Sequence, residues 1–314
     1  MSQTLFAPDV GTWLVDALMA VDRLVVSTGL LVLLGGAGFV AVARLPTPAW
    51  RLTRQIEGRA WLLLRAAWWV TLLGTVAGLL LHGPLAATVG TRFGAVWTAR
   101  VVLLLLLVAF LRAWSEREAP WERTGAWVAV GVLAAGLAVT PPLGGHAAAG
   151  PHPGVGVVIG VLHFSAAAVW FGGLVLLGTC ALPHADEGLL AALPRFSSAA
   201  FTAMVVTVVT GVLQGWRQLG SVPAAWDTGY GRLLIAKVAA FVVLIAVAGR
   251  SRALVRRRLT ARVLVGAAPH PAGEDGDARS VWLLRRLVLA EVATAIVVLA
   301  ITALLGLATP RSAA

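Results

Sequence analysis

The stretch Gly144–Gly173 reads GGHAAAGPHPGVGVVIGVLHFSAAAVWFGG and decides the fold class of this chain. It passes from a Gly/Pro-rich loop, which holds His146 and His152, into a long apolar segment. About 20 apolar residues are enough for a helix to cross a bilayer. His163 lies inside the apolar segment, where an ionisable side chain is costly and tends to mark a functional site. The stretch therefore predicts a membrane helix with a polar site near one end.

The composition of the whole chain indicates the same class. Hydrophobic residues make up 59% of the 314 residues and charged residues 12%, whereas globular domains carry about 25% charged residues. We predict an all-α, polytopic membrane protein with eight transmembrane helices, and the bilayer as its main partner. The predicted helices are Leu24–Ala43, Ala60–Leu81, Ala95–Leu111, Gly125–Pro141, Val155–Leu182, Ala199–Trp216, Leu233–Ala248 and Leu283–Ala308.

Arginines cluster after the first, third and seventh of these helices, and the alternate loops hold few cations. Because positive loops face the cytoplasm, we expect both termini to be extracytoplasmic. His82, His146 and His152 then lie at the outer face, and His163 lies two to three turns below it. The net charge of +11 is explained by cytoplasmic loops, so it predicts no nucleic-acid partner.

Two stretches 137 positions apart share a pattern. Thr91–Arg100 reads TRFGAVWTAR and Thr228–Lys237 reads TGYGRLLIAK, with Thr, an aromatic residue, Gly, Ala and a terminal cation at matching offsets. The pattern predicts two parallel four-helix repeats, residues 1–142 and 143–314, related by an axis along the membrane normal. A Pro/Gly/acidic segment at about 263–280 is predicted to be a flexible cytoplasmic linker.

The two predicted repeats differ in their polar residues. The helix Val155–Leu182 echoes the first helix at an offset of 138, which pairs His163 with Val25 and Trp170 with Val32. The second repeat therefore carries the polar chemistry, and the first is expected to be a scaffold.

Four histidines are candidate metal ligands. His163 and Trp170 are seven residues apart and share a helix face, and the small residues around them let a neighbouring helix approach closely. A short loop brings His146 over His163, and His152 and His82 lie at the same level. For His163 the structural alternative is a buried neutral ring bonded to a backbone carbonyl. Imidazole suits zinc, copper, nickel and iron, so the residue type does not choose the metal.

Six residues mark a possible ion path through the membrane or a buried polar group, and Trp170 is one of them. Met204 and Cys180 offer soft sulfur ligands that suit Cu(I), or they only fill space in the core. Arg100 and Lys237 occupy equivalent positions and either line a polar cavity or snorkel to the outer headgroups. Glu291 lies near mid-depth, so it is expected to form a buried pair or a proton or cation site.

Several motifs run through roughly Thr140–Pro310. They are GGHAAAG, LHFSAAAVWFGGL, RFSSAAF, TGYGRLLIAKVAAFVVLIAVAGRSR and a final Glu…Thr-Pro pattern. Together they resemble the copper resistance protein D (CopD) family of bacterial inner-membrane proteins. The resemblance implies a copper ion, as Cu(I) or Cu(II), with His146 and His163 among its ligands. Only three methionines are present, so the methionine-rich clusters of copper proteins are absent.

The preferred prediction is a non-enzymatic protein that imports copper across the bacterial cytoplasmic membrane, with an extracytoplasmic copper-binding protein as a possible donor of the ion. The sequence holds no GxxxxGK[ST] loop for ATP-driven pumping. Two alternatives stay open. One is a haem-b electron-transfer protein with His163, and His82 as its second ligand, and the other is a membrane assembly subunit without transport.

Overall fold

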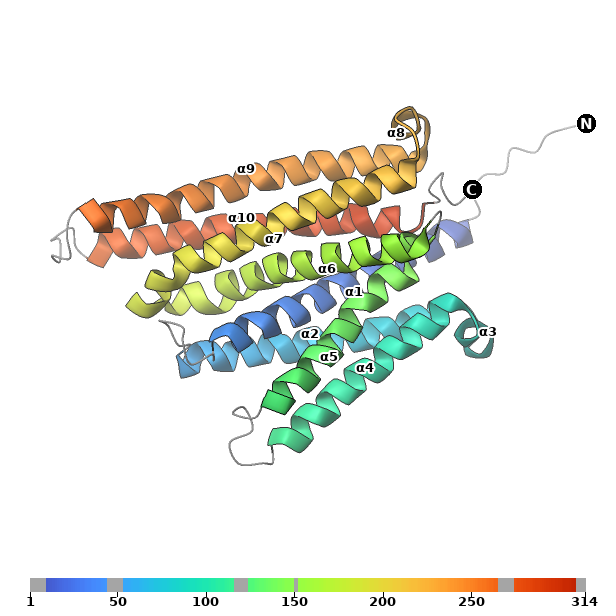
Figure 1. The fold of residues 1–314 in the computed structure, drawn as a ribbon, viewed down its shortest axis with the longest axis horizontal. Helices are drawn as coiled ribbons and strands as arrows, with labels where there is room; N and C mark the ends of the chain where they lie inside the picture. Colours follow the sequence, from blue (N-terminus) through green and yellow to red (C-terminus); the bar gives the residue numbers. More distant parts are fainter. Residues whose placement is uncertain (1–9, 44–52, 116–123, 150–151, 265–273, 309–314) are drawn as a thin grey trace, which may run out of the picture.

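The computed structural model describes residues 10–43, 53–115, 124–149, 152–264 and 274–308, and these ranges form helices and no β-strand (Figure 1). Eight of the described helices are long and apolar enough to cross a membrane, which confirms the predicted all-α polytopic class. They are α1 (Val10–Ala43), α2 (Arg54–Leu81), α4 (Arg92–Ser115), α5 (Thr124–Gly144), α6 (Pro153–Leu176), α7 (Glu187–Leu219), α9 (Gly229–Leu264) and α10 (Glu274–Leu305).

Several predicted helix ends need correction. Helix α7 begins at Glu187 rather than Ala199, α9 continues to Leu264 rather than ending at Ala248, and α10 begins at Glu274 rather than Leu283. Two further ends bear on the site. The first helix does not begin at Leu24, because α1 starts at Val10 and includes Asp22 and Arg23. These charges lowered the apparent hydropathy, but the helix buries them against its neighbours. The fourth helix does not end at the prolines but continues to Gly144. Arg92 supports this end, since its Nη2 donates to the carbonyl oxygen of Leu143 at 2.7 Å.

The predicted linker at about 263–280 is shorter than expected. Helix α9 runs to Leu264 and α10 begins at Glu274, and residues 265–273 lie outside the described part of the chain. The acidic sequence from Glu274 to Asp277 suits a helix start, where the helix dipole favours negative charge. The composition that predicts a linker therefore also fits the first turn of α10.

The repeated Thr-x-x-Gly motif forms the same local structure twice. Thr91 Oγ1 accepts a hydrogen bond from Gly94 N at 3.1 Å, and Thr228 Oγ1 accepts one from Gly231 N at 2.9 Å. These bonds cap the N-termini of α4 and α9. Two short helices that the sequence analysis does not predict, α3 (Leu85–Val89) and α8 (Ala224–Asp227), precede the motifs. Their carbonyl oxygens lie 2.0 and 2.3 Å from where a Cβ would stand on the two glycines, so only glycine fits.

Helices α1 and α6 pack closely along the middle of the bundle (Figure 1). A Cβ on Gly35 would lie 1.7 Å from the carbonyl oxygen of Ala168, and a Cβ on Gly172 would lie 2.5 Å from the carbonyl oxygen of Leu31. Gly172 lies 137 positions after Gly35, and Ala168 lies 137 positions after Leu31. The contact is therefore reciprocal, as it is across a two-fold axis. It supports the two-repeat organisation, which stays a prediction.

The reciprocal contact also changes the register between α1 and α6. At an offset of 137 the counterpart of Gly35 is Gly172, and the counterpart of His163 is Val26 rather than Val25. The second half still carries the histidine without an equivalent in the first. In the first half, α1 holds Asp22 and Arg23, and the scaffold role of that half stays a prediction.

One end of the bundle gathers the loop histidines. The short helices α3 and α8 lie at this end (Figure 1), together with the 3₁₀ turn η2 (His146–Ala148) and the start of α6. Helix α10 also ends here. Arg23 contacts this end, since its Nη1 donates to the carbonyl oxygen of Gly306 at 2.9 Å. This is the end that the loop charges predict to face outward.

Candidate functional site

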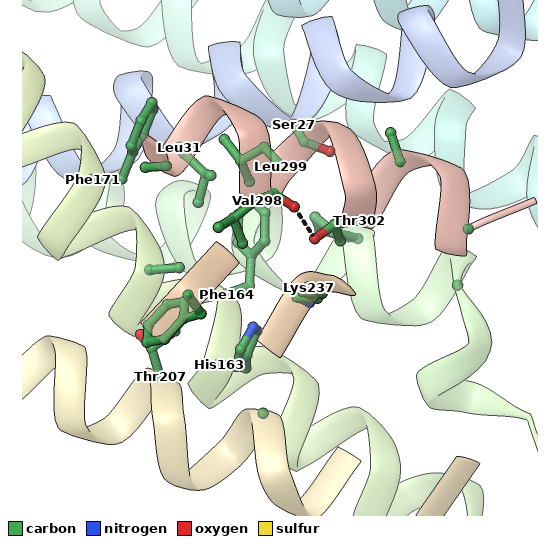
Figure 2. Close-up of a pocket in the computed structure, with 18 of the residues that line it drawn as sticks. Ser27, Leu31, His163, Phe164, Phe171, Thr207, Lys237, Val298, Leu299 and Thr302 are labelled. Atoms are coloured by element: carbon green, nitrogen blue, oxygen red, sulfur yellow. Dashed lines mark hydrogen bonds between the residues drawn. The ribbon is translucent and has the colours of Figure 1, made fainter. Parts of the chain in front are cut away.

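A cavity of about 640 Å³, the central cavity, lies between α1, α4, α6, α7, α9 and α10 (Figure 2). Most of its lining is aliphatic or aromatic, as illustrated by Leu31, Phe164 and Phe171. Both halves of the chain contribute to it. A mainly apolar cavity with a few convergent polar groups is the usual form of a ligand or transport site.

His163 lines the central cavity from α6. Its Nδ1 lies 3.0 Å from Thr210 Oγ1, and that hydroxyl donates its own hydrogen to the carbonyl oxygen of Val206 at 2.5 Å. With that hydrogen on the carbonyl, the hydroxyl accepts from the ring, and this arrangement favours the tautomer of the neutral imidazole with its hydrogen on Nδ1. The Nε2 lone pair of His163 is left free to bind a ligand. The backbone of Thr207 also interacts with the ring, so the structural alternative of a histidine bonded to a backbone carbonyl stays open beside the ligand role.

Three cationic side chains line the same cavity. They are Arg23, Arg100 and Lys237, and no Asp or Glu is among the lining residues of the described chain. Figure 2 shows Lys237 next to His163. Within the part of the chain that the structure describes, the Lys237 ammonium forms no hydrogen bond or ion pair. The cavity therefore presents an excess of positive charge to whatever enters it.

Arg100 points into the protein rather than toward headgroups. It is 4% exposed, and its Nε donates to Thr140 Oγ1 at 2.8 Å. Its guanidinium lies 5.1 Å from the centre of the Trp97 ring. Asp22, behind the cavity wall, interacts electrostatically with both Arg100 and Arg23. One carboxylate thus interacts with two guanidinium groups, and Arg23 Nε has no hydrogen-bond partner among the residues that the structure describes.

The other predicted histidines lie outside the lining of the central cavity. His82 stacks on Phe93, with ring centres 3.9 Å apart, and its Nδ1 lies 2.7 Å from the Gly78 carbonyl oxygen. His152 is exposed and adopts a left-handed backbone (φ 53°) before α6. Its carbonyl oxygen accepts from Arg217 Nη2 at 3.2 Å. The His163–His82 pair of the haem alternative is therefore not formed around this cavity.

His146 follows two lining residues of the cavity, Gly144 and Gly145, and lies beside the end of α10. Its ring centre is 6.2 Å from that of Tyr230, and its Nε2 is buried without a hydrogen-bond partner in the described ranges. Burial lowers the pKa of His146, partly offset by the nearby carbonyl groups of Leu305, Gly306 and Ala308. The neutral ring, the form that binds metals, is therefore favoured there.

Among the described residues, no group of three or more His, Cys, Asp and Glu side chains could hold a metal ion. The four predicted histidines are thus not gathered into one ligand set, because His82 and His163 each have separate local partners and His152 is exposed. A capture site formed by His146 and His163 stays a prediction.

A second, smaller pocket of about 140 Å³ lies toward the opposite end of the bundle. It brings together two predicted path residues, Met204 and Glu291, and Trp170 lines both this small pocket and the central cavity. Glu291 is 2% exposed, and its carboxylate accepts a hydrogen bond from Ser251 Oγ. Cys180 is buried on a π-helical turn after α6 and lines neither cavity.

The sequence analysis misses Asp22, Arg23, Ser251 and Thr210. Asp22 and Arg23 had a detectable signal, since apolar residues continue before them from Trp13 to Val21. A helix extended through the two charges would have placed them inside the membrane. Ser251 and Thr210 are recognisable only from their contacts with Glu291 and His163.

Eight membrane-length helices around a mainly apolar cavity with a few polar groups define a multi-pass membrane protein. Comparison with known families matches residues 190–305 to copper resistance protein D (CopD), which confirms the predicted family. The matched region spans α7 to α10 and includes Met204, Lys237 and Glu291, whereas His146 and His163 precede it. This is therefore a copper-related membrane protein.

A similar protein is Copper transport protein CutJ of Bacillus subtilis (strain 168). It is 30% identical over 159 residues, which cover 49% of this chain and 29% of CutJ. The alignment thus spans less than a third of that relative's length. No solved structure matches this chain.

Proposed function

We propose that this protein carries copper ions across the bacterial cytoplasmic membrane, inward from the extracytoplasmic side. The observation that carries the proposal is the free Nε2 of His163 in a cavity partly built by α7, α9 and α10, the helices that match the copper family. The small pocket lies on the other side of Trp170, which lines both cavities.

The outer step is capture near His146. Its buried Nε2 has no hydrogen-bond partner among the described residues, and burial lowers the pKa of the ring. A neutral imidazole with a free Nε2, close to the cavity lining, is suited to accept copper from an extracytoplasmic copper-binding protein. The glycines Gly144 and Gly145, which precede it, line the cavity, so a captured ion has a short way to His163.

The inner step passes Trp170. Its side chain is buried, packs edge-on against Phe241 at 5.9 Å between ring centres, and borders both cavities. A change in its position would connect them. Beyond it, the Met204 thioether supplies a soft ligand for Cu(I) and the Glu291 carboxylate offsets the positive charge. The small pocket is thus the inner station for the ion.

Electrostatics limit the form in which copper enters. Two unit charges about 6 Å apart repel by about 3 kcal/mol at an effective dielectric constant of about 20. Arg23, Arg100 and Lys237 therefore oppose a bare copper ion in the central cavity. An anion bound beside them would remove most of this cost.

Copper accumulation in cells tests the proposal. We expect cells that express His163→Gln or Glu291→Gln to accumulate copper no faster than cells with an empty vector. His152→Gln is the matched control, because His152 is exposed and lines neither cavity. Membrane levels of each variant are measured in parallel. Wild-type uptake by the His163→Gln protein would remove the cavity from the transport path.

Haem binding is the second candidate function, and one observation favours it. His163 offers a free Nε2 to an apolar cavity whose cations would pair with carboxylates. An absorption spectrum of the purified protein decides between the two, since a Soret band would replace the copper proposal.

A non-transporting assembly subunit is tested by copper content. Equal copper in the wild type, His146→Ala and His163→Ala would favour it.

A further inference from the structure

The central cavity is open sideways between α7 and α9. Val212 and Trp216 of α7 and Val238 and Val242 of α9 line the cavity, yet they are between 56% and 66% exposed. These positions lie within the membrane-length segments of both helices. The opening therefore faces the hydrocarbon of the bilayer rather than water, and whatever enters through it must itself be soluble in lipid.

The interior of the cavity combines apolar walls with positive charge. Phe164, Phe241 and Leu299 are among the wall residues, and Lys237 lies on the same helix as the opening. Lys237 has no partner within the described residues. A cation in a mainly apolar, membrane-embedded space is costly unless a counter-charge accompanies it. The protein supplies no carboxylate to the described lining, so the counter-charge is expected from a ligand.

We propose that the central cavity binds a lipid-derived amphipathic anion, an acyl chain with a carboxylate or phosphate head, which enters between α7 and α9. The head lies at Lys237, with Arg23 and Arg100 as further cations. The chain lies along the aromatic and aliphatic wall. The cavity volume of about 640 Å³ falls in the usual range of roughly 300–1,000 Å³ for ligand pockets.

Such a ligand goes beyond copper transport and does not depend on it. Its head group would also offset the cations beside His163. A bound anion would thereby lower the electrostatic barrier to a copper ion at that position. The two ideas are nevertheless separable, because lipid binding is measured on copper-free protein.

The test uses the full chain in nanodiscs of phosphatidylcholine, a lipid without net charge. Binding of radiolabelled oleate, lysophosphatidate and uncharged oleyl alcohol is measured. We expect one of the two anions to bind at least tenfold more tightly than oleyl alcohol, and the one that binds identifies the head group. Equal binding of all three probes, or binding of none, would overturn the proposal.

Variants connect the binding to the cavity. Lys237→Met is expected to weaken binding of the anion about tenfold, the loss of one charge-assisted hydrogen bond. Lys237→Arg should retain most of the affinity. Arg232→Met is the matched control, since Arg232 lies on α9 outside the cavity and bonds to the Trp226 carbonyl. If Lys237→Met does not fold, Lys237→Gln replaces it, and unchanged anion affinity in the folded variant would contradict the site.

Discussion

Replacing Gly35 by alanine tests how the two halves of the bundle are joined. The added Cβ would stand 1.7 Å from the carbonyl oxygen of Ala168. Because the neighbouring atom belongs to a backbone, no side-chain rotation relieves the overlap, and α1 or α6 must shift. Overpacking of this kind costs about 1–3 kcal/mol, and we expect the upper end. Alanine regains about 1 kcal/mol of helix propensity, so the expected net loss is about 2 kcal/mol.

Gly38→Ala is the matched control on the same helix, since no atom lies within 4 Å of its Cβ position. That variant should be as stable as the wild type or slightly more stable. Gly172→Ala should resemble Gly35→Ala, because its Cβ would meet the Leu31 carbonyl oxygen at 2.5 Å. The double variant should lose less than the sum of the two, since one shift of the helices relieves both overlaps.

The assay is the free energy of unfolding in mild detergent, measured by titration with a denaturing detergent. The reasoning predicts the order Gly38→Ala, then wild type, then Gly35→Ala from most to least stable. Equal stability of Gly35→Ala and Gly38→Ala would refute the close contact between α1 and α6. A strictly additive double variant would refute its reciprocal character.

Three further predictions follow from local geometry. Thr91→Ala and Thr228→Ala should each lower the free energy of unfolding by about 1 kcal/mol, the usual value of an N-cap. Thr202 only bonds the carbonyl of Ser198 in its own helix, so Thr202→Ala should lower it less. Similar losses in all three variants would contradict the caps. Asp22→Asn removes the carboxylate that faces Arg23 and Arg100 and should lower the free energy of unfolding by about 3 kcal/mol. Asp16 is exposed on the same helix, so Asp16→Asn should leave the stability unchanged. Unchanged stability in both variants would contradict the buried network. Burial lowers the pKa of His146, so its contribution to stability is present above the ordinary pKa of about 6.5 and is lost as the pH falls below it. The wild type should therefore lose more thermal stability between pH 7 and pH 5 than His146→Gln. An equal loss in both proteins would contradict the burial.

Hydropathy and helical spacing predict most of the fold. The eight membrane helices and the interior position of Trp170 and Glu291 follow from them, because a bilayer demands long apolar helices and hides their polar residues. The short helices α3 and α8 escape this logic, since five or four residues carry no periodic signal. The Thr-x-x-Gly motif marks the position of α3 and α8 only through the contact of its glycine with their carbonyl oxygens, and that contact is known only from the structure.

The site is less predictable than the fold. The sequence identifies His163 as an intramembrane ligand candidate, but it cannot supply Thr210 as the hydroxyl that frees Nε2. It groups His82 with His163 by depth, whereas the structure places His82 against Phe93. Depth along a helix is readable from sequence, but the direction of a side chain depends on the packing of helices far apart in the chain.

The charges of the cavity illustrate the same limit. Arg100 and Lys237 are equivalent in the repeat pattern, yet Arg100 faces Asp22 and Lys237 faces no carboxylate in the described chain. The difference arises from a charge on α1 that hydropathy alone assigns to a loop. Compensation of buried charge is a property of the assembled bundle and not of any one segment.

Copper flux into liposomes that contain the purified protein tests the central claim most directly. A copper-binding fluorophore is enclosed in the liposomes, and copper is added outside with a reductant. The account predicts flux for the wild type and for His152→Gln, and flux at the level of protein-free liposomes for His163→Gln. Equal flux through the wild type and His163→Gln, or none through the folded wild type, would contradict it.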